Sequence, residues 1–227
     1  MKTLITVICI TALCFYGCQD KETSLEFEQK VLDQLLISLV DSSYKDNRLY
    51  TLSPRLGKDL FDKNGKWIDR DTLGQGRRDE EYELERKALK NDTVNLVIAI
   101  NDTVNPISDE DMLLIAREFP DFKLNADNQN GPEKYKLDLA SQTNHKFLFK
   151  YISELPRDIE FKNWENKYKK FAGSLMFSRI QFDNKKENGV LSIGYYCGGK
   201  CGVGYLVFIK KINDNWVIDK VVDTWIA

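Results

Sequence analysis

The last third of the chain alternates between apolar runs and turn residues. Runs rich in Val, Ile, Phe and Tyr occupy residues 175–182, 190–196, 205–211 and 216–226. Asp, Asn and Gly separate them, and these residue types favour tight turns. Because short connections make neighbouring strands antiparallel, the pattern predicts a four-stranded meander. The run at 205–211 is apolar on both faces, so we expect it to lie inside the sheet.

The earlier part of the chain shows helical spacing. Thr23 and Glu26 form a capping box, and apolar residues then recur every three or four positions, which predicts a helix over residues 23–42. A charged segment and a segment capped by Ser108 predict helices at 79–90 and 108–118. The remaining patterns predict an irregular segment at 48–76, strands at 96–100, 135–139 and 146–152, and a short aromatic helix at 161–171.

These elements predict an α+β fold, in which helices pack on an antiparallel sheet that ends in the C-terminal meander. A helix followed by a curved sheet is also typical of an NTF2-like cone, which encloses a pocket. We expect residues 24–227 to form a single α+β domain. With 42% hydrophobic residues among 227, the chain has enough apolar side chains for a core.

The turn between the second and third runs reads Cys197-Gly198-Gly199-Lys200-Cys201-Gly202. Two cysteines facing each other across a tight turn satisfy the geometry of a disulfide, so Cys197 and Cys201 are predicted to close the hairpin. Two other interpretations stay open: an anion site made of glycine amides beside Lys200, and a metal or redox site. A zinc site would require further Cys or His ligands, and the sequence contains one histidine.

The first 17 residues predict a secretory leader. Lys2 precedes an apolar run that is too short to span a bilayer, and Gly17 comes just before Cys18. The segment 15–18 resembles the lipobox of bacterial lipoproteins, in which the cysteine is acylated and becomes the mature N-terminus. This resemblance implies a signal peptide at 1–17, a lipid anchor on Cys18 and a tether at 18–23. Gln19 after the anchor favours the outer membrane of the cell envelope, on its periplasmic or its surface face.

Three short segments carry Asp-Thr followed by an aliphatic residue. They are similar to the acceptor motif of a periplasmic O-glycosylation system in some Gram-negative bacteria. The resemblance implies glycosylation at Thr72, Thr93 and Thr103.

Charge and motifs narrow the chemistry. A formal net charge of −2 lacks the basic excess that drives nucleic-acid binding. His145 stands in a polar turn, without zinc spacing or a serine motif beside it. We therefore expect no catalytic residue, cofactor or metal, although carboxylate pairs brought together by the fold would escape sequence motifs.

One longer pattern recurs near the C-terminus: Trp164, Tyr168, Ser178-Arg179, Phe182, Cys197-Gly198, Cys201-Gly202, Gly204, Trp216 and Val217. It resembles a group of uncharacterised bacterial exported proteins and lipoproteins that share a W…SRxxF…CGxxCGxG…WxV ending. The resemblance implies export and a sheet whose hairpin is closed by a disulfide. The sequence thus predicts a membrane-anchored envelope lipoprotein that acts as a binding or interaction module, with an envelope protein or a glycan as partner. The alternative is an envelope hydrolase acting on cell-wall or carbohydrate material.

Overall fold

The C-terminal strands form an antiparallel meander, as the sequence predicts. A computed structural model describes residues 23–46, 48–49, 52–54, 56–120, 122–123, 131–142, 146–155, 164, 167–198 and 201–226. Strands β7 (Phe171–Phe177), β9 (Asn188–Gly198), β10 (Cys201–Ile212) and β11 (Asn215–Ile226) lie side by side, each antiparallel to the next. The short β8 (Gln181–Phe182) also pairs with β9. Strand β10 lies between β9 and β11, which confirms its expected place inside the sheet.

The sheet continues beyond the meander with parallel strands. Strand β3 (Leu96–Ile100) lies between β7 and β6 (Phe147–Tyr151) and runs parallel to both. The resulting seven-stranded sheet has the order β11-β10-β9-β7-β3-β6, with β8 beside β9, and is therefore mixed. Strands were expected at 96–100 and 146–152, but their direction depends on partners far away in the sequence, which the local pattern does not contain.

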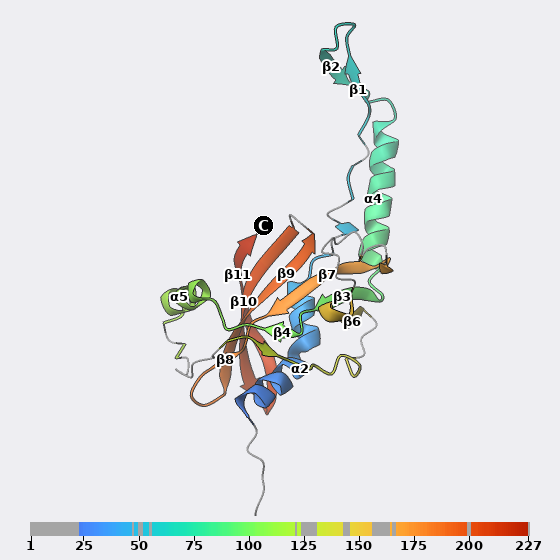
Figure 1. Ribbon diagram of the computed structural model, residues 1–227. Coiled ribbons are helices and arrows are strands. Elements are labelled where there is room, and N and C mark those ends of the chain that lie inside the picture. Colours follow the sequence, from blue (N-terminus) through green and yellow to red (C-terminus); the bar gives the residue numbers. More distant parts are fainter. Residues whose placement is uncertain are drawn as a thin grey trace, which may run out of the picture.

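One face of the sheet is covered by α2 (Ser24–Ser43) (Figure 1). Its capping box is present: Glu26 N donates to Thr23 Oγ1 at 3.2 Å, and Thr23 N donates to Glu26 Oε2 at 2.9 Å. The apolar stripe of α2 packs against the sheet in the main core, together with Ile98, Leu175 and Ile193. Burial of this stripe is what holds the helix in place.

The other face of the sheet is covered in two separate places. Helix α5 (Asp109–Glu118) covers one of them, where Ile115 joins Leu206 and Phe208 in a second cluster. Around the 3-10 helix η1 (Ile152–Glu154), Leu155 packs on Val97 and Phe171 in a third cluster. Between the two covers, Met176, Ser192 and Tyr196 are half-buried rather than buried.

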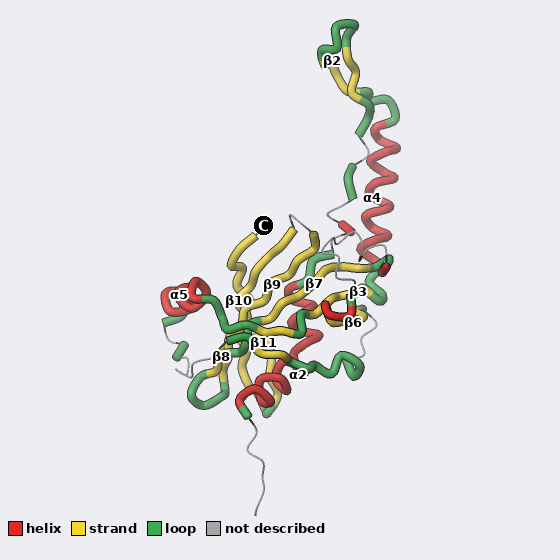
Figure 2. The backbone as a smooth tube through the Cα atoms, viewed as in Figure 1, coloured by secondary structure: helices red, strands yellow, loops and turns green. Residues whose placement is uncertain are grey.

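Residues 59–91 project from the sheet as an extension that we call the arm (Figures 1 and 2). It consists of a hairpin of β1 (Asp59–Phe61) and β2 (Trp67–Arg70), followed by α4 (Gln75–Asn91). The expectation of an irregular segment at 48–76 is wrong here, because β1 and β2 pair and α4 begins four residues earlier than expected. No residue of the arm is buried.

The segment 135–139 is not a strand either. The neighbouring β5 (Glu133–Lys134) pairs instead with β4 (Thr103–Val104). Tyr135 and Leu137 are nevertheless buried in the main core. The apolar alternation therefore predicts their burial correctly, but the strand that it also predicts does not form. Five of the eleven residues of the helix expected at 161–171 lie outside the described residues. Trp164 and Lys167 are helical, but residues 168–170 are not, and β7 already begins at Phe171, so the end of the expected helix is wrong.

Candidate functional site

The accessible part of the sheet follows from the alternation of side chains along β9 and β10. Ile193, Tyr195 and Val203 point to the α2 face and join the main core. The residues between them therefore point to the opposite face, since successive strand residues alternate. On β9 these are Ser192, Gly194 and Tyr196, and on β10 they are Gly202 and Gly204. The absence of a side chain at the three glycines leaves room above the sheet.

The ring of Trp225, from β11, fills part of this room. A Cβ atom on Gly204 would collide with the indole, and one on Gly202 would lie 3.0 Å from indole Cζ3. The indole thus lies against the backbone of β10, where a side chain would displace it. Trp225 is still 38% exposed, so part of its ring is available to solvent.

Tyr196 completes an aromatic pair. The ring centroids of Tyr196 and Trp225 are 5.6 Å apart, with 41° between the planes. This geometry lies within the range in which aromatic rings attract one another, so the two rings support each other's orientation. Residue Gly194 belongs to the same surface, because a Cβ there would lie 3.0 Å from the Tyr196 ring.

A cleft of about 150 Å³ lies beside the aromatic pair. It is bounded by β7, β9, β10, β11 and the segment that leads into α5. Polar side chains at its wall provide hydroxyl, amide and carboxylate groups: Asn105, Ser108, Asp111, Ser192 and Thr224. Ser108 also caps α5, because its Oγ accepts a hydrogen bond from Asp111 N at 3.1 Å. Aromatic rings beside polar groups at the edge of a cleft are the composition expected of a small-ligand site.

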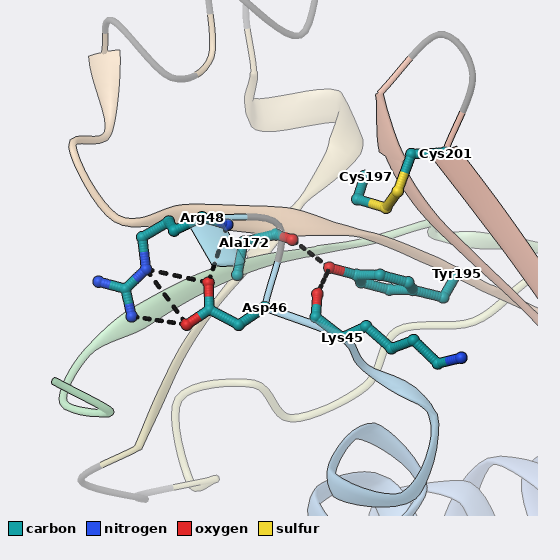
Figure 3. Close-up of a disulfide and its surroundings, with 7 residues drawn as sticks. All are labelled: Lys45, Asp46, Arg48, Ala172, Tyr195, Cys197 and Cys201. Atoms are coloured by element: carbon teal, nitrogen blue, oxygen red, sulfur yellow. Dashed lines mark hydrogen bonds and ion pairs between the residues drawn. A yellow bond between two sulfur atoms is a disulfide. The ribbon is translucent and has the colours of Figure 1, made fainter. Parts of the chain in front are cut away.

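The cysteine pair packs with the main core, on the face opposite to the aromatic pair. It connects β9 and β10 at the end of their hairpin (Figure 3). Cys197 and Cys201 form a disulfide with their Cα atoms 5.1 Å apart, and Cys197 is buried in the main core. The hydroxyl of the nearby Tyr195 lies within hydrogen-bonding distance of the carbonyl oxygens of Lys45 and Ala172. The hairpin is therefore fixed to the segment that follows α2. Gly199 and Lys200, on which the anion hypothesis depends, lie outside the described residues.

A buried ion pair joins α2 to the loop between β7 and β8. The Arg179 guanidinium donates to Glu28 Oε1 at 2.7 Å, and Ile180 N donates to Glu28 Oε2 at 3.3 Å. Tyr135 donates its hydroxyl to the same carboxylate. Burial raises the pKa of the Tyr135 phenol, and the hydrogen bond to Glu28 raises the pKa of Arg179, so both donors keep their protons. Both carboxylate oxygens of Glu28 have hydrogen-bond partners, which indicates a structural role.

This network explains part of the C-terminal sequence pattern. Ser178 Oγ accepts a hydrogen bond from Ser192 N at 2.8 Å and holds β7 against β9, while Arg179 binds Glu28. Phe182 and Trp216 pack together with ring centroids 5.3 Å apart, and both contact Phe27 of α2. Arg179, Phe182 and Trp216 of this pattern therefore join the sheet to α2.

The three threonines of the acceptor motif occupy different surroundings. Thr72 is exposed in the turn between β2 and α4. Thr93 is half-buried, and its neighbour Asp92 is bound by Lys170 at 2.6 Å and Arg48 at 2.9 Å, which lower the pKa of that carboxyl. Thr103 is half-buried within β4. Their glycosylation stays a prediction of the sequence.

Cys18 and His145 lie outside the described residues. No sequence motif points to the aromatic pair or to the polar rim. The signal for them is the alternation of small with apolar residues. In β9 this alternation predicts a strand with one buried face, and in β10 Gly202 and Gly204 are explained by the adjacent turn.

No family model, curated protein or solved structure matches this chain. Among the described residues, no helix is both long enough and apolar enough to cross a membrane, and no cluster of His, Cys, Asp and Glu side chains has the arrangement of a metal site.

Proposed function

We propose that the protein is a lipid-anchored binding module of the bacterial cell envelope, and that the cleft beside Trp225 and Tyr196 binds a glycan. The observation that carries this proposal is the Trp225 ring, which lies on a glycine floor and keeps part of its surface open beside hydrogen-bonding groups. Sugar rings combine apolar C–H faces with hydroxyl groups. They therefore suit a flat aromatic surface with a polar rim.

The size and composition of the cleft support a small part of a glycan as the bound unit. A volume of about 150 Å³ is below the usual range of pockets that enclose drug-sized molecules, so the ligand would leave most of its length in solvent. The polar groups around the aromatic pair are mostly uncharged, with Asp111 as the carboxylate at the rim. Such a rim favours neutral, hydroxyl-rich ligands.

The anchor rests on the sequence around Cys18. Thr23 caps α2 only five residues later, so an acylated Cys18 would hold the start of α2 within about 17 Å of the membrane surface. Acyl chains contribute about 0.8 kcal/mol per buried methylene, and several chains bind firmly. We expect Cys18→Ala to release the protein from membranes or to block its processing. Detergent partitioning and the mass of the mature N-terminus are the measurements; a soluble wild-type protein with unmodified Cys18 would contradict the anchor.

Binding at the cleft is tested with a soluble β-1,4-linked tetramer of N-acetylglucosamine and with a neutral hexose tetramer as probes. Calorimetric titration measures the affinity of every variant. In the wild type the fluorescence of Trp225 should also change, because the sugar ring stacks on the indole. We expect saturable binding of at least one probe, and about tenfold weaker binding, or ~1.4 kcal/mol, in Trp225→Leu. The matched control is Trp67→Leu, which removes an exposed tryptophan from the arm and should leave the affinity unchanged.

The outcomes separate the two functions that the sequence allows. If Trp225→Leu binds both probes as tightly as the wild type, or if the wild type binds neither, the proposed cleft function is wrong. Cleavage of a probe that disappears in Asp111→Asn would favour the hydrolase, since Asp111 is the rim carboxylate. Product analysis of the probe after incubation makes this distinction.

A further inference from the structure

The arm exposes an unusual amount of apolar surface. In the hairpin, Phe61, Trp67 and Ile68 are each more than half exposed. Leu73, just before α4, and Leu84, in the middle of α4, are exposed as well. An isolated two-stranded hairpin and a single helix of this length are each marginally stable in water. Both elements would gain stability from a partner that covers them.

The charges of α4 are divided between its two halves. Residues 75–83 contain four acidic and two basic residues, a net charge of −2, whereas residues 85–91 contain three basic and one acidic residue, a net charge of +2. Leu84 separates the halves. This distribution is complementary to itself when two copies of the helix run antiparallel, because each acidic half then faces a basic half.

Both exposed leucines and three of the charged residues lie on one stripe of the helix. Successive steps of three or four residues from Leu73 lead through Arg77, Glu80, Leu84 and Lys87 to Asn91. The opposite side of α4 is already half-buried at Gln75, Tyr82 and Leu89. The stripe that contains Leu84 is therefore the side that a partner helix can cover.

We propose that two copies of this chain associate through their arms, with the α4 helices antiparallel and the twofold axis at Leu84. Leu84 then contacts its counterpart, and Lys87 of each copy lies opposite Glu80 and Glu81 of the other. Glu81 also pairs with Arg77 of its own helix at 3.8 Å, an exposed contact that leaves its carboxylate within reach of a second cation. This association is independent of the glycan cleft, which lies on the sheet.

The hairpins extend the contact beyond the helices. A helix of 17 residues is about 25 Å long, and the hairpin continues past Gly74 while the sheet lies past Asn91. In the antiparallel pair, each hairpin therefore reaches the base of the other arm. Val94 and Leu148 are exposed there, near the paired beginnings of β3 and β6. The hairpins add area that a helix pair needs in order to approach the ~1,000 Å² of a specific interface.

The arrangement is compatible with anchoring in one membrane. The start of α2 and the tip of the arm lie at opposite ends of the molecule (Figure 1). Both tethers consequently leave from the outer ends of the pair. A pair that lies along the membrane surface keeps each tether within its reach of about 17 Å.

Cysteine cross-linking of the full chain, produced with its own leader in a Gram-negative host, tests the geometry. A twofold axis at residue 84 brings residues with numbers that add up to 168 into contact. We expect Leu84→Cys to form a disulfide-linked dimer on a non-reducing gel. Arg77→Cys and Asn91→Cys, expressed singly, should stay monomeric, because identical positions would be about 21 Å apart. Co-expression of these two variants should restore the linked dimer.

Charge reversal is a second, independent test, in which the linked dimer of Leu84→Cys is the readout. Glu81→Lys or Lys87→Glu alone should lower the yield of linked dimer several-fold, and the combination of both should restore it. Retained melting temperature shows that each variant is folded. Absence of the linked Leu84→Cys dimer in the folded protein overturns the proposal. Linked dimers of Arg77→Cys alone also overturn it, because they indicate parallel helices or random collision.

Discussion

The sheet with its helices and the arm use the same residue types in opposite ways. In α2, Leu32, Leu36 and Leu39 are completely buried, and the one buried carboxylate, Glu28, has donors on both oxygens. In the arm, Leu84 is 68% exposed, and charged residues form solvent-exposed pairs such as Arg70 with Asp59. The sheet region is thus stabilised by its own apolar core. The arm depends on helix propensity and local contacts, so equal substitutions should have unequal costs in the two regions.

The largest difference is expected for ion pairs. Arg179→Ala would leave the Glu28 carboxylate buried without its cation, which costs about 3–5 kcal/mol of unfolding free energy. Arg70→Ala is the matched change in the arm, where both partners are about 40% exposed, and should cost at most about 1 kcal/mol. Urea unfolding of both variants measures the two values.

A double variant sharpens this test. Glu28→Leu combined with Arg179→Met replaces the buried pair by apolar side chains of similar size. It should be more stable than Arg179→Ala, because no unpaired charge remains. If Arg179→Ala and Arg70→Ala cost the same, the buried pair is not what joins α2 to the sheet.

The same substitution in two helices gives the next largest contrast. Leu36→Ala removes a fully buried side chain of the main core and should destabilise the protein by about 2–5 kcal/mol. Leu84→Ala changes an exposed side chain in α4 and should change the stability of the monomer by less than about 0.5 kcal/mol. Melting curves at low protein concentration provide the comparison. Equal losses would mean that α4 is part of the core.

The sheet region could be predicted from the sequence because burial leaves a periodic signal. The stripe of α2, the capping box, the α5 cap at Ser108 and the antiparallel C-terminal strands follow from local patterns that the structure confirms. The single strand expected at 175–182 is divided between the end of β7 and β8. The sequence does not predict the arm hairpin, because β1 has three residues and β2 has four. All of them are exposed except the half-buried Arg70, so they show no alternation. The parallel placement of β3 and β6 was missed because it depends on distant pairing.

The candidate site was harder to predict than the fold. Gly202 and Gly204 are next to the turn that contains Cys201, and a glycine in a turn needs no further explanation. Their role as a floor appears only when β11 brings Trp225 over them, 21 residues beyond Gly204 in the sequence. Asn105 and Asp111 come from a third segment, so no short motif contains the site.

The smallest of the expected stability effects concerns the two hairpins. The β1–β2 hairpin is exposed, whereas β9 and β10 lie inside the sheet and are also joined by Cys197 and Cys201. Because the strands already hold the ends of this loop together, the disulfide should add stability without creating the fold. Closing such a short loop contributes about 2 kcal/mol in the chain-entropy model. Combined Cys197→Ser and Cys201→Ser substitutions should therefore give a folded protein that melts about 4–8 °C lower.

Two measurements decide this last prediction. Thiol alkylation of the wild-type protein under denaturing, non-reducing conditions should leave Cys197 and Cys201 unlabelled, because both sulfurs are in the disulfide. Hydrogen exchange of the serine variant should be faster near the β9–β10 turn and unchanged in the β1–β2 hairpin, since the two hairpins are supported separately. Full labelling of both cysteines would show that the disulfide is absent. Loss of the folded sheet in the serine variant would show that the strands do not fold without it.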